Sequence, residues 1–123
     1  MPYSVTYLED LGAIETVYTG ALAPGELDQA ITATGTLAAE NLCNRFLVDC
    51  RDMAPGGSTL DIWALAEFLA SLPLGIIERE AILLPATERG AEDMTFFETA
   101  ARNRGLNVRA FEARQDAIAW LAE

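Results

Sequence analysis

The stretch that decides the fold is residues 45–61, RFLVDCRDMAPGGSTLD. It opens with a short apolar run at 45–50, bounded by polar residues, which is typical of a buried strand. Residues 52–57 follow, with a proline and two glycines that indicate a loop. Residues 58–61 then match the capping-box pattern at the start of a helix, which Pro73 ends. The stretch therefore predicts a strand, a loop and a helix, the repeating unit of an α/β protein.

The same pattern continues to the end of the chain. A buried run at 80–85 precedes a helix that we expect to open at Glu92 or Asp93 and to stop at Gly105. Residues 106–111 predict a last strand, and residues 115–121 a last helix.

The beginning of the chain predicts a hairpin. Residues 3–8 alternate with the period of a strand, a turn follows, and residues 13–19 are rich in β-branched and aromatic side chains. A helix is expected from about 24 to 41, weakened slightly by Gly35. The predicted order is ββαβαβαβα. We expect a single α/β domain over residues 1–123, with one mixed sheet and helices packed on it.

The charge and hydropathy of the chain limit its partners. Its net charge is −11, from 19 acidic residues and 8 basic residues that are all arginine. Such a field repels phosphate backbones and anionic lipid head groups, so we expect no nucleic-acid and no membrane partner. No apolar run approaches the roughly 20 residues of a membrane helix. Since the N-terminus also lacks the pattern of a secretory signal, we expect a cytoplasmic protein.

Several catalytic chemistries lack their residues. Without histidine there is no Ser-His-Asp or Cys-His arrangement, and Gly56–Gly57 is not a nucleotide-binding motif. Cys43 and Cys50 are too few for a zinc site and are interpreted as small buried side chains. Asp49 ends a strand as in a response-regulator receiver, but a receiver also needs a lysine, which this chain lacks. We expect no enzyme activity, no metal and no cofactor.

The element order and three segments resemble the STAS domain family, the anti-sigma-factor-antagonist fold, and its SpoIIAA-like relatives. The segments are the strand 46–49 that ends in aspartate, the stretch 103–111 (NRGLNVRAF) and the closing helix 117–121 (AIAWL). The resemblance covers nearly the whole chain, from Val5 to Leu121. It implies a SpoIIAA-like fold and a domain that binds partner proteins or small ligands.

The resemblance also implies a candidate phosphorylation switch. STAS antagonists carry a phosphorylated serine where the second helix opens, within an Asp-Ser-Ser-Gly-like sequence. Here the stretch 56–61 offers Ser58 and Thr59 but lacks that signature. A phosphoryl group would be stabilised at the helix N-terminus, whereas the simpler interpretation is that one hydroxyl caps the helix.

Aromatic and acidic side chains supply further candidate contacts. Trp63 and Phe68 are five residues apart, about 140° around a helix, so both cannot face one core. One of them is expected to meet a partner, a second subunit or a ligand. Asp49 and Asp52 lie at the carboxyl end of a strand, where α/β proteins build sites, although Asp49 can also accept loop hydrogen bonds. The aromatic side chains as a set could belong to the core or could line an apolar pocket: Trp63, Phe68, Phe96, Phe97, Phe111 and Trp120.

Three functions remain open from these residues. The leading hypothesis is a non-enzymatic, STAS-like regulatory or protein-interaction module, switched at Ser58 or Thr59. The alternative is a domain that binds a small apolar ligand, which requires a cleft between helix and sheet. The third is a homodimeric scaffold with neither switch nor ligand.

Overall fold

The computed structural model describes residues 2–23, 25–54, 59–73 and 75–123. Within them five strands and four helices alternate in the predicted order. The elements are β1 (Tyr3–Leu8), β2 (Ala13–Gly20), α1 (Glu26–Glu40), β3 (Arg45–Met53), α2 (Thr59–Ala70), β4 (Arg79–Leu83), α3 (Glu88–Asn103), β5 (Val108–Phe111) and α4 (Arg114–Leu121).

The strands form one mixed sheet in the order β1-β2-β3-β4-β5. β1 and β2 are antiparallel, and all later pairs are parallel. Gly12 makes the tight turn of the hairpin with a φ of 71°, and its N–H donates to the Leu8 carbonyl at 2.8 Å. The prediction of a mixed α/β sheet with helices packed on it is confirmed.

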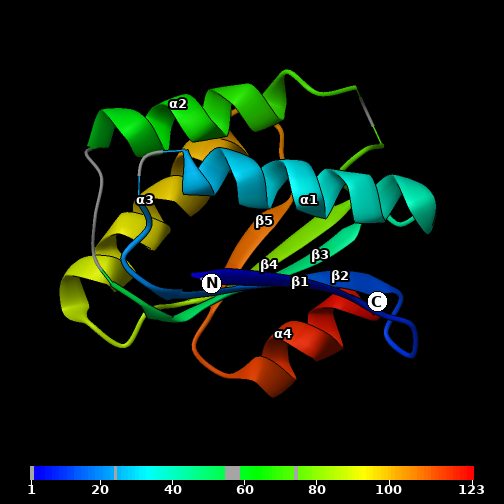
Figure 1. Ribbon diagram of the computed structural model, residues 1–123. Helices are drawn as coiled ribbons and strands as arrows, with labels where there is room; N and C mark the ends of the chain where they lie inside the picture. The colour runs from blue at the N-terminus through cyan, green and yellow to red at the C-terminus, as the bar shows by residue number, and fades with distance from the viewer. Residues whose placement is uncertain (1, 24, 55–58, 74) are drawn as a thin grey trace.

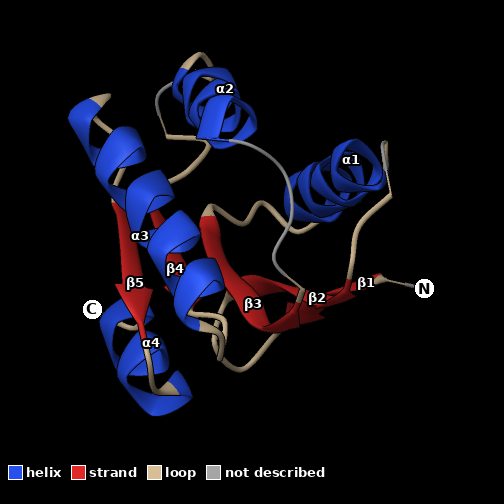
Figure 2. Ribbon diagram, turned by 90° about the vertical axis from the view of Figure 1, so that its left-hand side faces the viewer, coloured by secondary structure: helices blue, strands red, loops and turns tan. Residues whose placement is uncertain are grey.

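The helices cover the two faces of the sheet unequally. α1, α2 and α3 lie on one face, and α4 lies on the other (Figures 1 and 2). Each of the first three connects two neighbouring parallel strands, and the three connections step across the sheet in one direction. Connections of a common hand must then place their helices on the same face. We call this the cleft face, and the opposite one the α4 face.

Helix α3 begins earlier than expected. It starts at Glu88, where the Thr87 side chain caps it by accepting a hydrogen bond from the Gly90 N–H at 3.1 Å. A Cβ atom at Gly90 would lie 2.7 Å from both the Pro85 Cβ and the Thr87 Oγ1. The predicted start at Glu92 or Asp93 was wrong because a glycine in the first turn is needed for this close approach, although glycine usually argues against a helix.

Strand β3 also runs further than the predicted 45–50. After an irregularity between Val17 and Thr19, β2 pairs again with β3 as far as Met53. The predicted first residue of the first helix, Pro24, lies outside the described residues, and α1 begins at Glu26.

The α4 face has a filled core. Its buried side chains come from β2, β3, β4 and α4, and the rings of Phe111 and Trp120 pack 5.7 Å apart. The fully buried residues include Leu47, Leu83 and Leu121.

No helix in the described ranges is long and apolar enough to cross a membrane.

Candidate ligand-binding cleft

An apolar cleft of about 450 Å³ lies between the helices and the sheet on the cleft face. Its position follows from the packing of the helices. α1 packs on β1 and β2, while α2 packs on α3, and α3 packs on β5. The sheet between these two groups of helices is covered by neither, and side chains of β3 and β4 form the floor of the cleft there.

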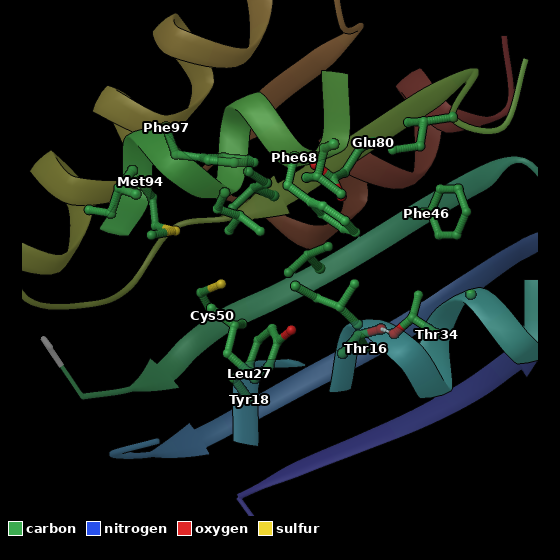
Figure 3. Close-up of a pocket in the computed structure, with 18 of the residues that line it drawn as sticks. Thr16, Tyr18, Leu27, Thr34, Phe46, Cys50, Phe68, Glu80, Met94 and Phe97 are labelled. Carbon is green, nitrogen blue, oxygen red and sulfur yellow. Dashed lines mark hydrogen bonds between the residues drawn. The ribbon is translucent and has the colours of Figure 1, made fainter. Parts of the chain in front are cut away.

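The walls of the cleft are almost entirely apolar. Figure 3 shows Phe68 and Phe97 on one side and Thr16 and Tyr18 on the other. The alternation of β3 directs Val48 into the cleft, because successive strand residues point to opposite faces. Phe68 lines the cleft although the residue is 52% exposed, so the cleft opens to solvent beside α2.

Glu80 is the one charged side chain among the described residues that line the cleft. It is only 9% exposed, and its Oε2 atom has no hydrogen-bond partner in the described part of the chain. Burial raises the pKa of this carboxyl to about 7. An unpaired acid in an apolar site is costly to fold, which makes it a candidate functional group.

Two further titratable groups lie near Glu80. Burial, with smaller contributions from the charges of Asp49 and Glu80, raises the pKa of the Cys50 thiol to about 12. Burial likewise raises the pKa of Tyr18, with Cys50 and Glu80 adding to the effect. Both groups are therefore neutral at physiological pH. Cys50 packs as the small buried side chain that was predicted.

A pair of threonines fixes α1 to the sheet at the edge of the cleft. The Thr34 hydroxyl donates to the Ala30 carbonyl at 2.7 Å, and the Thr16 and Thr34 oxygens are 2.7 Å apart. Since the Thr34 proton is already used, Thr16 must be the donor between them. These polar atoms satisfy one another, and they hold one wall of the cleft in place.

The predicted contact residues do not gather at the cleft. Asp49 lies on the α4 face, where Arg51 donates to both of its carboxylate oxygens, at 3.0 and 2.8 Å. Burial acts to raise the pKa of Asp49, but the Arg51 hydrogen bonds and the charges of Arg51 and Arg114 outweigh it and lower the pKa. Arg114 also pairs with Glu15 on that face.

The other three lie in different places. Asp52 is exposed and lines a second hollow at the carboxyl ends of β3 and β4. Trp63 is 43% exposed on α2, and the Arg104 guanidinium lies 5.2 Å from the centre of its ring. Phe68 alone reaches the cleft. As the 140° spacing required, Trp63 and Phe68 do not share one core.

The candidate switch residues fall at the edge of the described chain. Ser58 lies outside the described residues. Thr59 is the first residue of α2, and its side chain also lies outside the description. Of the six aromatic side chains considered for a pocket, Phe68 and Phe97 line the cleft, whereas Phe111 and Trp120 belong to the core of the α4 face.

Glu80 was not predicted as a site residue, although the strand pattern around it carries a signal. It was interpreted as the first residue of a buried strand, and the alternation of that strand places Glu80 on the same face as Ile82. A carboxylate at an inward position is rare unless it is paired or functional. The neighbouring cleft residues Tyr18 and Phe46 were also missed, because only the strand order brings them together with Glu80.

Comparison with known proteins leaves the family of the chain open. No protein-family model, no curated protein and no solved structure matches it.

Proposed function

We propose that this protein binds a small apolar molecule in the cleft between α1, α2 and the sheet. The observation that carries the proposal is the cleft itself: about 450 Å³, lined by apolar side chains, with one buried carboxyl. Ligand sites generally have volumes of about 300–1,000 Å³, apolar walls and few polar groups. The cleft has each of these properties.

The size of the cleft argues for an occupant. Protein interiors hold few voids larger than one water molecule. At roughly 24 cal/mol per Å³, a dry apolar cavity of this volume would cost on the order of 10 kcal/mol, comparable to the whole stability of a domain. The opening beside Phe68 lets water in, and water against apolar walls is what an apolar ligand displaces favourably. At about 30 Å³ for each non-hydrogen atom, the cleft holds roughly 15 such atoms.

Mass measurement tests this proposal. We expect protein purified from its own host to carry extra mass under native conditions, and this mass to be lost on denaturation. The variant Val48→Phe places a ring into the cleft from its floor and should abolish the extra mass. Val17→Phe is the matched control, since Val17 is half-buried on the opposite face of the same sheet. Bare polypeptide in the native spectrum, or equal ligand loss in both variants, would contradict the proposal.

We propose, as a second function, the STAS-like regulatory module that the sequence resembles. It is supported by the element order and by the position of Thr59 at the start of α2, where a helix N-terminus stabilises a phosphate. The partner would be a protein or a second copy of this chain in the cytoplasm. A double variant, Ser58→Ala with Thr59→Ala, should then lose phosphorylation-dependent partner binding. Unchanged binding would count against the switch.

A further inference from the structure

We infer that the cleft selects ligands whose polar end donates a hydrogen bond, such as alcohols and amines, and that Glu80 receives this end. The inference rests on the proposed function and deepens it, because it names the chemistry of the ligand. It stands on the position of Glu80, on its Oε2 atom, which has no partner in the described part of the chain, and on the charges around the cleft.

Glu80 lies on the floor of the cleft, within the sheet. It pairs in register with Phe46 of β3 and Val108 of β5, so the strands on both sides of it present apolar side chains. Its backbone N–H donates to the Asn107 carbonyl at 3.0 Å, which fixes the strand at this point. The side chain is therefore held in place while its Oε2 atom lacks a protein donor among the described residues.

Neighbouring side chains in the described ranges do not supply a hydrogen-bond donor to the Oε2 atom of Glu80. The Thr16 proton is directed to Thr34, and the Thr34 proton to Ala30. No arginine is among the described residues that line the cleft, and the five described ion pairs lie elsewhere. Since no described residue donates to Oε2, the ionised carboxylate, present above about pH 7, is left to solvent or a ligand for this donor.

The charge of the site decides which ligands fit. The described lining of the cleft holds no cation, so a carboxylate head group would face Glu80 unpaired, in a protein of net charge −11. A ligand without a polar end would cover Glu80 and leave its oxygen unpaired, which costs the full desolvation of that oxygen. A hydroxyl or an ammonium group supplies the missing donor, and the apolar walls take the remainder of the molecule.

Calorimetric titration at pH 8 with octan-1-ol, octylamine and octanoate tests the inference. The three probes have eight carbon atoms each, which is within the capacity of the cleft, and differ mainly in the polar end. We expect the alcohol and the amine to bind at least tenfold more tightly than octanoate. Lengthening the alcohol should tighten binding about fourfold for each methylene, as for burial in an apolar site.

Two variants of Glu80 make the test specific. Glu80→Gln keeps the shape of the side chain but adds N–H donors, so octanoate should gain affinity and octylamine should lose at least tenfold. Glu80→Leu should remove the advantage of octylamine over octanoate and bring these two charged probes to within about threefold of each other. Glu92→Gln is the control, because it removes the same charge from an exposed position on α3. It should leave the wild-type preference unchanged.

The outcomes separate the inference from the function on which it rests. If octanoate binds as tightly as octylamine, or if octylamine keeps its advantage over octanoate in Glu80→Leu, the inference is wrong although the cleft binds alkyl chains. If none of the three probes binds and Val48→Phe changes nothing, the proposed function itself fails.

Discussion

Each face of the sheet buries a carboxylate, and the two carboxylates differ in their hydrogen bonds and in the packing around them. On the α4 face, Asp49 is held by two hydrogen bonds from the Arg51 side chain, and the surrounding core is filled. On the cleft face, the Oε2 atom of Glu80 has no partner among the described residues, and Glu80 borders about 450 Å³ of open space. The packing on the α4 face thus stabilises the fold, whereas the cleft face has features that lower stability. Local features that lower stability are typical of functional sites.

Truncating a core leucine should show the largest difference between the faces. Leu83→Ala, in the filled core of the α4 face, is expected to lower the free energy of unfolding by about 2–5 kcal/mol. Leu65→Ala, on the wall of the cleft, should cost less than about 1.5 kcal/mol, because the leucine is only partly buried and already borders a cavity. Denaturant unfolding of both variants measures this, and equal losses would mean that the cleft is closed in solution.

The two carboxylates should give opposite dependences of stability on pH. The pKa of Glu80 is raised to about 7 from 4.5, so its stabilising contribution is complete below about pH 4.5 and is lost as the pH rises through 7. The pKa of Asp49 is lowered, so its contribution is present above its ordinary pKa and is lost on acidification.

Glu80→Gln should therefore stabilise the protein at pH 8, by on the order of 3 kcal/mol, and by little at pH 4. Tyr18 and Cys50, whose pKa values the charge of Glu80 raises further, stay neutral over this range. Thermal unfolding from pH 4 to 8 checks the effect. A variant no more stable than wild type at pH 8 would show that Glu80 has found a donor in the folded protein.

The threonine pair should respond unequally to removal of either hydroxyl. Thr34→Val leaves the buried Thr16 hydroxyl without its acceptor, at an expected cost of about 1–3 kcal/mol. Thr16→Val should cost less than about 1 kcal/mol, because Thr34 keeps its bond to the Ala30 carbonyl. Chemical denaturation of both variants tests the assignment of the donor, and the reverse order of costs would overturn it.

The smallest expected effect lies at the edge of the cleft. Gly35 is an exposed glycine within α1, and a Cβ atom there would meet nothing within 4 Å apart from its chain neighbours and the backbone of its own helix. Gly35→Ala should therefore stabilise the protein by about 1 kcal/mol through helix propensity alone. A loss of stability in a thermal melt would mean that the space beside α1 is occupied.

The order of the elements could be predicted from the sequence because each element carries a local signal. The apolar run around Val48 and the turn at Gly12 depend on neighbours in the chain alone. The cleft could not be predicted in this way. It depends on which strands α1 and α2 cover, and this follows from the strand order, for which the sequence carries no local signal.

The candidate site shows the same limit. Phe68 was predicted as a contact from its angle to Trp63, a property of one helix. Glu80 was missed because its isolation depends on residues from three strands and on the absence of a donor among them.

The central claim is that the cleft face, and not the α4 face, receives an apolar ligand. Amide chemical-shift mapping during titration with octan-1-ol tests it most directly. The account predicts shifts that saturate and that cluster around Tyr18, Ile31 and Phe68, with Leu47 and Trp120 unmoved. Shifts centred on the α4 face, or none at saturating alcohol, would contradict it.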